Sequence, residues 1–254
     1  MIFDQGPYLC IGADPHKNLL SEWGLADSPK GLEDFVQIFL GALPAQLQVV
    51  KPQVSLFESY GSQGFAVLEN FLSELKAKGK FVIADAKRAD IGSSMKGYSD
   101  AWLTESAPFT ASALTVNPYL GVKSLAETIA VAVENQKRVF VLVATSNPEA
   151  EEIQSKGLSR GILDELNAFD PSGLGVVVGA TVDKDLHGLG DQLAELEIPI
   201  LAPGFGVQGA KLSEASAIFE GVSNKLIANV SRAVLNGERE NLSERIKQAM
   251  AELA

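Results

Sequence analysis

The densest group of reactive side chains lies between residues 85 and 90, directly after an apolar run. The segment reads Asp85-Ala86-Lys87-Arg88-Ala89-Asp90. On a strand, side chains at i and i+2 share a face, so Asp85 and Lys87 can point the same way. A carboxylate beside an ammonium favours the charged form of each, so we expect Lys87 to be a protonated donor and a fixed positive charge. Lys51 ends a neighbouring run. Taken alone, the segment fits a structural salt-bridge network as well as it fits catalysis.

A second group of residues has the composition of a phosphate site. Residues 203–209 read PGFGVQG, a flexible loop that offers free backbone amides, and Ser231-Arg232 directly follows the last apolar run. An arginine can hold phosphate oxygens in a bidentate geometry. Each feature alone is more simply a glycine-rich turn or a surface arginine. Together, at the ends of two successive predicted strands, they indicate phosphate binding.

The elements that must position these groups are short runs rich in Val, Ile and Leu, nearly continuous in apolarity. This is typical of parallel strands that are covered on both faces. The runs are Tyr8–Ala13, Gln48–Lys51, Phe81–Asp85, Ala113–Asn117, Val139–Thr145, Gly175–Gly179, Ile198–Ala202 and Leu226–Val230. Segments with helical spacing lie between and after them, at Leu32–Leu43, Phe65–Lys78, Leu125–Val133, Ile162–Phe169, Leu186–Leu196, Leu212–Phe219 and Leu242–Leu253.

This alternation predicts an α/β fold, a (β/α)8 TIM barrel that forms one catalytic domain over residues 1–254. A doubly wound open sheet is the alternative. The barrel is favoured because no glycine-rich dinucleotide fingerprint follows the first run and no linker divides the chain. Barrel enzymes carry their chemistry at the C-terminal ends of the strands. The runs end at Asp14, Lys51, Asp85 with Lys87, Asn117, Ser146, Gly179-Ala180, Pro203-Gly204 and Ser231-Arg232.

Composition excludes several classes of protein. The chain has 254 residues, with 21 Lys+Arg against 32 Asp+Glu, and lacks the basic cluster that a nucleic-acid partner requires. Cys10 is the single cysteine and is expected in the core, so neither an intrachain disulfide nor a cysteine-rich zinc site can form. His16 and His187 lack ligand spacing and are expected on the surface, without a metal. With no signal sequence and no apolar run of about 18 residues, we expect a cytoplasmic protein without a membrane partner.

These motifs give the chain a specific resemblance to the orotidine 5′-monophosphate decarboxylase family, whose signature is D-x-K-x-x-D-I. Here that signature is Asp85-Ala86-Lys87-Arg88-Ala89-Asp90-Ile91. The bacterial branch with a longer chain is matched by further motifs in the same order. These are Ile11–His16 (IGADPH), Val50–Val54 (VKPQV), Asn117–Gly121 (NPYLG), Ala144–Glu149 (ATSNPE) and Pro203–Gly209 (PGFGVQG).

The resemblance implies decarboxylation of orotidine 5′-monophosphate to UMP, the last step of de novo UMP synthesis, without a cofactor. Lys51, Asp85, Lys87 and Asp90 would form a charged network in which Lys87 protonates the pyrimidine carbon. Asp90 would enter the partner's site in a homodimer. The implied substrate contacts are Asp14 and Lys51 to the ribose, Ser146 to the pyrimidine, and Gln208 and Arg232 to the phosphate. Pro203 would belong to a closing loop, and Ser231, next to Arg232, and Ser94, near Asp90, would also bind substrate.

Two positions depart from the family pattern. Ala89 stands where many relatives carry glycine, and its methyl group would cost about 1 kcal/mol or more if the backbone there needs a positive φ. Ser94 stands where a threonine is common and keeps the hydroxyl. Three other functions remain as alternatives: a magnesium-dependent sugar-phosphate decarboxylase, a Schiff-base aldolase using Lys87, and a phosphate-binding module without catalysis.

Overall fold

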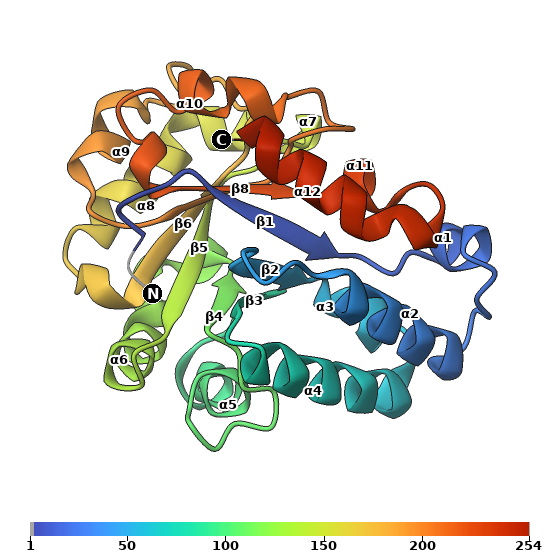
Figure 1. The fold of residues 1–254 in the computed structure, drawn as a ribbon. Coiled ribbons are helices and arrows are strands. Elements are labelled where there is room, and N and C mark those ends of the chain that lie inside the picture. The colour runs from blue at the N-terminus through green and yellow to red at the C-terminus, as the bar shows by residue number, and fades with distance from the viewer. Residues whose placement is uncertain (1–2, 254) are drawn as a thin grey trace.

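The computed structural model describes residues 3–253 and forms a closed barrel of parallel strands in the order β1 to β8 (Figure 1). Each strand pairs with its neighbours in sequence, and β8 closes the barrel on β1. The predicted (β/α)8 fold is therefore confirmed. The strands are β1 (Tyr8–Ala13), β2 (Val49–Pro52), β3 (Phe81–Arg88), β4 (Ala113–Val116), β5 (Arg138–Ala144), β6 (Leu174–Val178), β7 (Ile200–Ala202) and β8 (Leu226–Val230).

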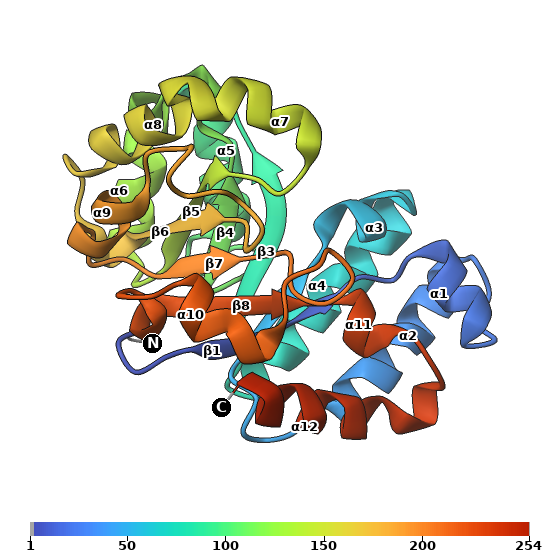
Figure 2. The same cartoon turned by 90° about the horizontal axis from the view of Figure 1, so that it is seen from above.

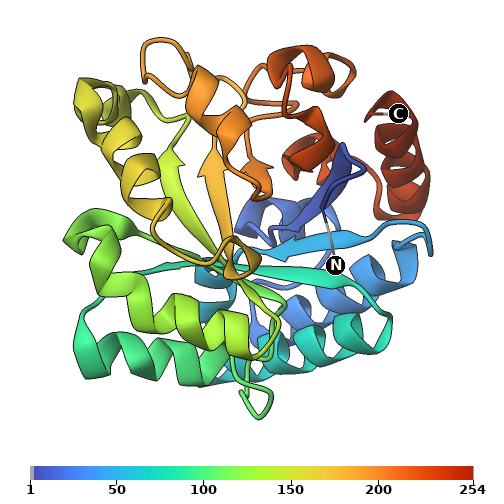
Figure 3. The same cartoon turned by 90° about the vertical axis from the view of Figure 1, so that its left-hand side faces the viewer.

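Helices surround the strands (Figure 3). The helices are α1 (Lys17–Glu22), α2 (Pro29–Ala42), α3 (Val54–Glu58), α4 (Gly61–Ala77), α5 (Gly92–Trp102), α6 (Ala126–Glu134), α7 (Pro148–Ile153), α8 (Ser159–Leu166), α9 (Gly190–Glu195), α10 (Ala215–Ile218), α11 (Arg232–Leu235) and α12 (Leu242–Leu253). Short 3-10 and π turns join several of them. The predicted helix at Leu186–Leu196 begins only at Gly190, because Gly188 has a φ of +64°, outside the helical region.

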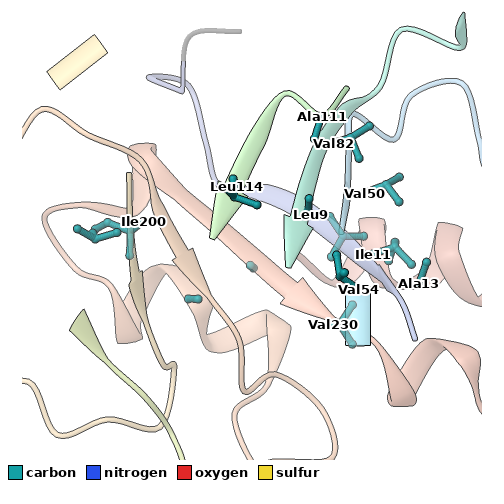
Figure 4. Packing of buried hydrophobic residues seen from close by; sticks show 14 of the residues in the cluster. Leu9, Ile11, Ala13, Val50, Val54, Val82, Ala111, Leu114, Ile200 and Val230 are labelled. Carbon is teal, nitrogen blue, oxygen red and sulfur yellow. The ribbon is translucent and has the colours of Figure 1, made fainter. Parts of the chain in front are cut away.

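The core has two layers, inside the barrel and between the strands and helices. Leu9, Ile11 and Ala13 belong to the outer layer, whereas Cys10 faces the barrel interior, as the two-residue period of a strand requires. Ile11 lies next to Val50 of the neighbouring strand (Figure 4). Cys10 is fully buried, as predicted, and burial raises the pKa of its thiol well above the usual range.

The prediction that His187 lies on the surface is wrong. The ring is buried, and its Nδ1 lies 3.1 Å from the Ser159 Oγ at the start of α8. That hydroxyl donates to the Val143 carbonyl of β5, so His187 ties the loop after β6 to the end of β5. His16 is exposed, as predicted. Within residues 3–253, no helix combines the length and apolarity that crossing a membrane requires.

Candidate active site

A cavity of about 490 Å³ opens at the C-terminal ends of the strands. Figure 2 shows β8 pointing toward α11, so the residues that follow the strands gather at this end. The predicted residues that line the cavity are Asp14, Lys51, Asp85, Lys87, Ser146, Pro203, Gln208, Ser231 and Arg232. They come from six different strand ends, as a barrel site requires.

The strand period explains how the floor of the cavity is built. The innermost layer of the barrel includes Cys10 of β1, Val49 of β2, Ile83 of β3, Ala113 of β4 and Ile227 of β8. Two residues further along each strand, the side chain points inward again, one layer nearer the mouth. Those positions hold Gly12, Lys51, Asp85, Thr115 and Asn229. At four of these five positions a polar residue therefore follows directly on the apolar layer, and the fifth is Gly12.

Asp85 is the centre of a buried charged chain. Its Oδ2 accepts a hydrogen bond from Lys51 Nζ at 2.7 Å, and its Oδ1 accepts one from Lys87 Nζ at 2.6 Å. The side chains of Lys51 and Asp85 are 5% and 10% exposed, whereas that of Lys87 is 46% exposed. Lys87 is therefore the ammonium that is both held by the carboxylate and open to a ligand in the cavity.

Burial and charge act in opposite directions on the two buried members of this chain. Burial favours the neutral form of Asp85, but the ammonium groups of Lys51 and Lys87 outweigh it and hold the pKa of the carboxyl well below its usual range. Burial likewise favours neutral Lys51, yet the carboxylates of Asp85 and Asp14 raise its pKa above the usual range. Both groups are charged at neutral pH.

Thr115 and Asn229 are cavity residues that the sequence analysis missed. The Thr115 hydroxyl contacts Asp85 Oδ1 at 3.0 Å and accepts from the Lys87 backbone N–H at 2.9 Å. Asn229 is buried, and its Oδ1 accepts no hydrogen bond from the described residues, as is also true of Asp14 Oδ1. Both oxygens belong to side chains that line the cavity, where a ligand with donor groups would satisfy them.

The loop that the sequence predicts to bind phosphate departs from the prediction in one detail. The loop was expected to offer free backbone amides, and two of its amides are not free: that of Gly206 donates to the Ala210 carbonyl at 2.7 Å, and that of Gly209 donates to the Gly206 carbonyl. These bonds shape the loop and leave Gln208 exposed on the cavity wall. Arg232, at the start of α11, is exposed and makes no ion pair within residues 3–253. Its guanidinium is therefore available to an anion.

Gly12 is required by the close approach of β1 to Ser231. A Cβ at Gly12 would lie 1.9 Å from Ser231 Oγ and 2.9 Å from its Cβ. The missing side chain therefore makes room for the Ser231 hydroxyl, which belongs to a residue that lines the cavity.

Asp90 and Ser94 do not line the cavity of their own chain. Asp90 Oδ1 accepts from the backbone amide of Ile91, and Ser94 is exposed in the first turn of α5. Ala89 is not among the described residues with a positive φ, so its methyl group causes no strain of that kind.

Comparison with known proteins places this geometry in a family. Residues 7–245 match the family model described as Orotidine 5′-phosphate decarboxylase / HUMPS family. The chain belongs to this family. Relatives named orotidine 5′-phosphate decarboxylase include one from Streptomyces coelicolor, 42% identical over 244 residues (91% of this chain and 86% of the relative). Another, from Corynebacterium glutamicum strain R, is 40% identical over 241 residues, covering 89% of this chain and 85% of the relative.

Solved structures agree with this family membership. A crystal structure of a Streptomyces avermitilis protein, provisionally assigned as an orotidine 5′-phosphate decarboxylase, superimposes with a TM-score of 0.89. It is 39% identical and covers 98% of this chain and 90% of its own. The Methanocaldococcus jannaschii orotidine 5′-monophosphate decarboxylase, solved with the inhibitor BMP, has a TM-score of 0.71 over 97% of this chain and 98% of its own. At 20% identity, this second likeness bears on the fold alone.

Proposed function

We propose that this member of the family converts orotidine 5′-monophosphate to UMP and carbon dioxide without a cofactor. The observation that carries the proposal is the Lys51–Asp85–Lys87 chain at the floor of the cavity, with Gln208 and Arg232 on its wall. A nucleotide whose phosphate meets Arg232 would place its base above the three charged side chains. Asp14, Lys51 and Asn229 would face the ribose and base, and Ser146 the pyrimidine edge.

The chemistry follows from the charges. When the C6–carboxylate bond breaks, carbon dioxide leaves and the electron pair of that bond remains on C6. With the base placed as proposed, the Lys87 ammonium stabilises this pair and then transfers its proton to C6, which gives UMP and a neutral amine that solvent reprotonates. Asp85, fixed between two ammonium groups, is a preorganised charge that holds Lys87 toward the reacting carbon. Remote binding of the phosphate supplies energy for closing the site over the substrate.

The test is the loss of the ultraviolet absorbance of orotidine 5′-monophosphate on addition of the purified protein, with and without excess chelator. We expect turnover in both conditions. Lys87→Ala should abolish it while UMP binding persists, and Lys30→Ala, on the exposed face of α2, should leave it unchanged. Turnover that chelator removes would support the magnesium-dependent sugar-phosphate alternative. An adduct on Lys87 trapped by borohydride would support the aldolase, and UMP binding without turnover the binding module.

We also propose that Asp90 completes the site of a second copy in a homodimer. Two observations support this: Asp90 does not line its own cavity, and exposed apolar side chains lie after β3 and β4. Ile91 is 60% exposed, Tyr119 84% and Leu120 49%, and all three lie on the loops that follow two neighbouring strands. A partner that carries the same face would cover them.

Mixing two inactive variants tests the shared site. Lys87→Ala and Asp90→Ala should each be inactive alone, because each removes one member of every site. After unfolding and refolding together, half of the dimers should be mixed, and each mixed dimer should hold one site with both groups intact. Activity should then return to about a quarter of the wild-type level. Failure of the mixture to recover, with dimers shown by sedimentation, would place Asp90 in the site of its own chain, and an Asp90→Ala variant that is active alone would place it outside catalysis.

A further inference from the structure

Strand β3 has an irregular pairing with β4 at the position where the charged residues begin. Ala84 pairs with Leu114, but the next pair joins Arg88 to Val116. Three residues of β3, from Asp85 to Lys87, therefore lie opposite the single residue Thr115. A bulge of this kind bends a strand and redirects its side chains, and it is common beside active sites.

The backbone of Lys87 shows the consequence of the bulge. Its φ is +48°, one of two positive values among the described non-glycine residues. A lysine adopts this region only when surrounding contacts hold it there. One such contact is the hydrogen bond that the Lys87 backbone N–H donates to Thr115 Oγ1 at 2.9 Å.

The Thr115 hydroxyl has a single possible orientation. The amide of Lys87 can only donate, and the ionised carboxylate of Asp85 can only accept. The hydroxyl therefore accepts from Lys87 N–H and donates its one proton to Asp85 Oδ1, 3.0 Å away. That same oxygen also accepts from Lys87 Nζ at 2.6 Å. One hydroxyl thus fixes both the backbone of Lys87 and the carboxylate that holds its ammonium.

We propose that Thr115 is a positioning residue that sets where the Lys87 ammonium stands relative to the reacting carbon. It acts through Lys87 and Asp85 and exchanges no proton with the substrate. The side chain is 1% exposed, so valine, with nearly the same shape, would keep the packing and remove only the hydrogen bonds. The kinetic consequence rests on the proposed decarboxylase function.

The kinetic experiment compares Thr115→Val, Thr115→Ser and wild type. Removing the hydroxyl should lower kcat by about a hundredfold, the scale of a misplacement of about 1 Å, and should change KM little. Thr115→Ser keeps the hydroxyl and should restore most of kcat. Thr128→Val is the matched control, since Thr128 is equally buried but its hydroxyl bonds Ser99 on α5. This control should keep the wild-type kcat.

Two kinetic results would overturn the proposal: a Thr115→Val variant with wild-type kcat, or a loss confined to KM, which would mean that Thr115 contacts substrate. A structural arm separates this failure from failure of the proposed function. In crystals of Thr115→Val, Lys87 Nζ should lie more than about 1 Å from its wild-type position. If the wild type shows no turnover, the proposed function fails, and this displacement alone decides the positioning role. An unmoved Lys87 would overturn it.

Discussion

Replacing Asp85 by asparagine should destabilise the protein far more than the same substitution of an aspartate on the protein surface. Asp85 separates two ammonium groups, at 2.7 Å from Lys51 Nζ and 2.6 Å from Lys87 Nζ. Asparagine keeps the size of the side chain but leaves Lys51, 5% exposed, without its main counter-charge. Breaking a buried ion pair by removing one partner costs about 3–5 kcal/mol, against about 0–1 kcal/mol for a surface pair.

The assay is urea unfolding of wild type and Asp85→Asn at neutral pH, followed by circular dichroism. Asp34→Asn is the control, because Lys30 contacts Asp34 at a similar 2.9 Å while both side chains are exposed. It should change the free energy of unfolding little. A loss below about 1 kcal/mol in Asp85→Asn would refute the reasoning, since it would show that water already stabilises Lys51.

The dependence on pH gives the same prediction a second check. The folded pKa of Asp85 lies below its unfolded value near 3.9, so its stabilisation is complete above about pH 5 and is lost only as the pH falls through the lower, folded value. In Asp85→Asn, burial still favours the neutral form of Lys51, whereas the strongest influence that raises its pKa, the Asp85 carboxylate, is gone. The unfolded variant then holds more protons than the folded variant, so its stability should rise above neutral pH more steeply than that of the wild type. Parallel curves would contradict this account.

Three further outcomes follow from other contacts. Asn229→Leu should raise the free energy of unfolding by roughly 1–3 kcal/mol, because it removes a buried oxygen that has no described hydrogen-bond partner. The same variant should bind UMP more weakly in calorimetry. A loss of stability would show that the amide of Asn229 is already hydrogen-bonded. Gly12→Ala should cost roughly 1–3 kcal/mol through overlap with Ser231, and a double variant with Ser231→Gly should recover most of it in the same melts. Burial lowers the pKa of Lys137 to about 8 in the folded protein, against an unfolded value near 10.4. Between these two pH values the unfolded state holds more protons, so this lysine should make wild-type stability rise with pH. Lys137→Met should lack that contribution to the slope.

The fold was predictable because barrel strands are covered on both faces. The predicted bounds of β1, Tyr8–Ala13, and of β8, Leu226–Val230, agree with the structure, and those of the other strands differ by one to three residues. The largest discrepancy is β3, predicted to end at Asp85 but continuing to Arg88. Charged residues resemble a loop in sequence, and nothing local indicates that Thr115 of the next strand holds them in a bulge.

The burial of barrel strands on both faces also explains which site residues were missed. Residues that follow a strand, such as Asp14 and Ser231, are recognisable because polarity changes there. Thr115 and Asn229 lie within their strands, where apolarity on both faces leaves no alternation to show which side chains enter the barrel. His187 was misplaced for a related reason, because its partner Ser159 lies 28 residues away. A pattern of spacing cannot reveal such a partner.

The charge of the whole chain and the charge of the cavity have opposite signs. The chain carries −11, yet the charged residues that line the cavity are Lys51, Lys87 and Arg232 against Asp14 and Asp85. One carboxylate is already bonded to two of these cations, so Arg232 is left to attract an anion. A barrel mouth with this surplus can draw in a phosphorylated, carboxylated nucleotide despite the repulsion from its acidic exterior. Raising the salt concentration should therefore weaken binding through Arg232 while leaving the buried Lys51–Asp85 pair intact, because screening acts mainly on exposed charges.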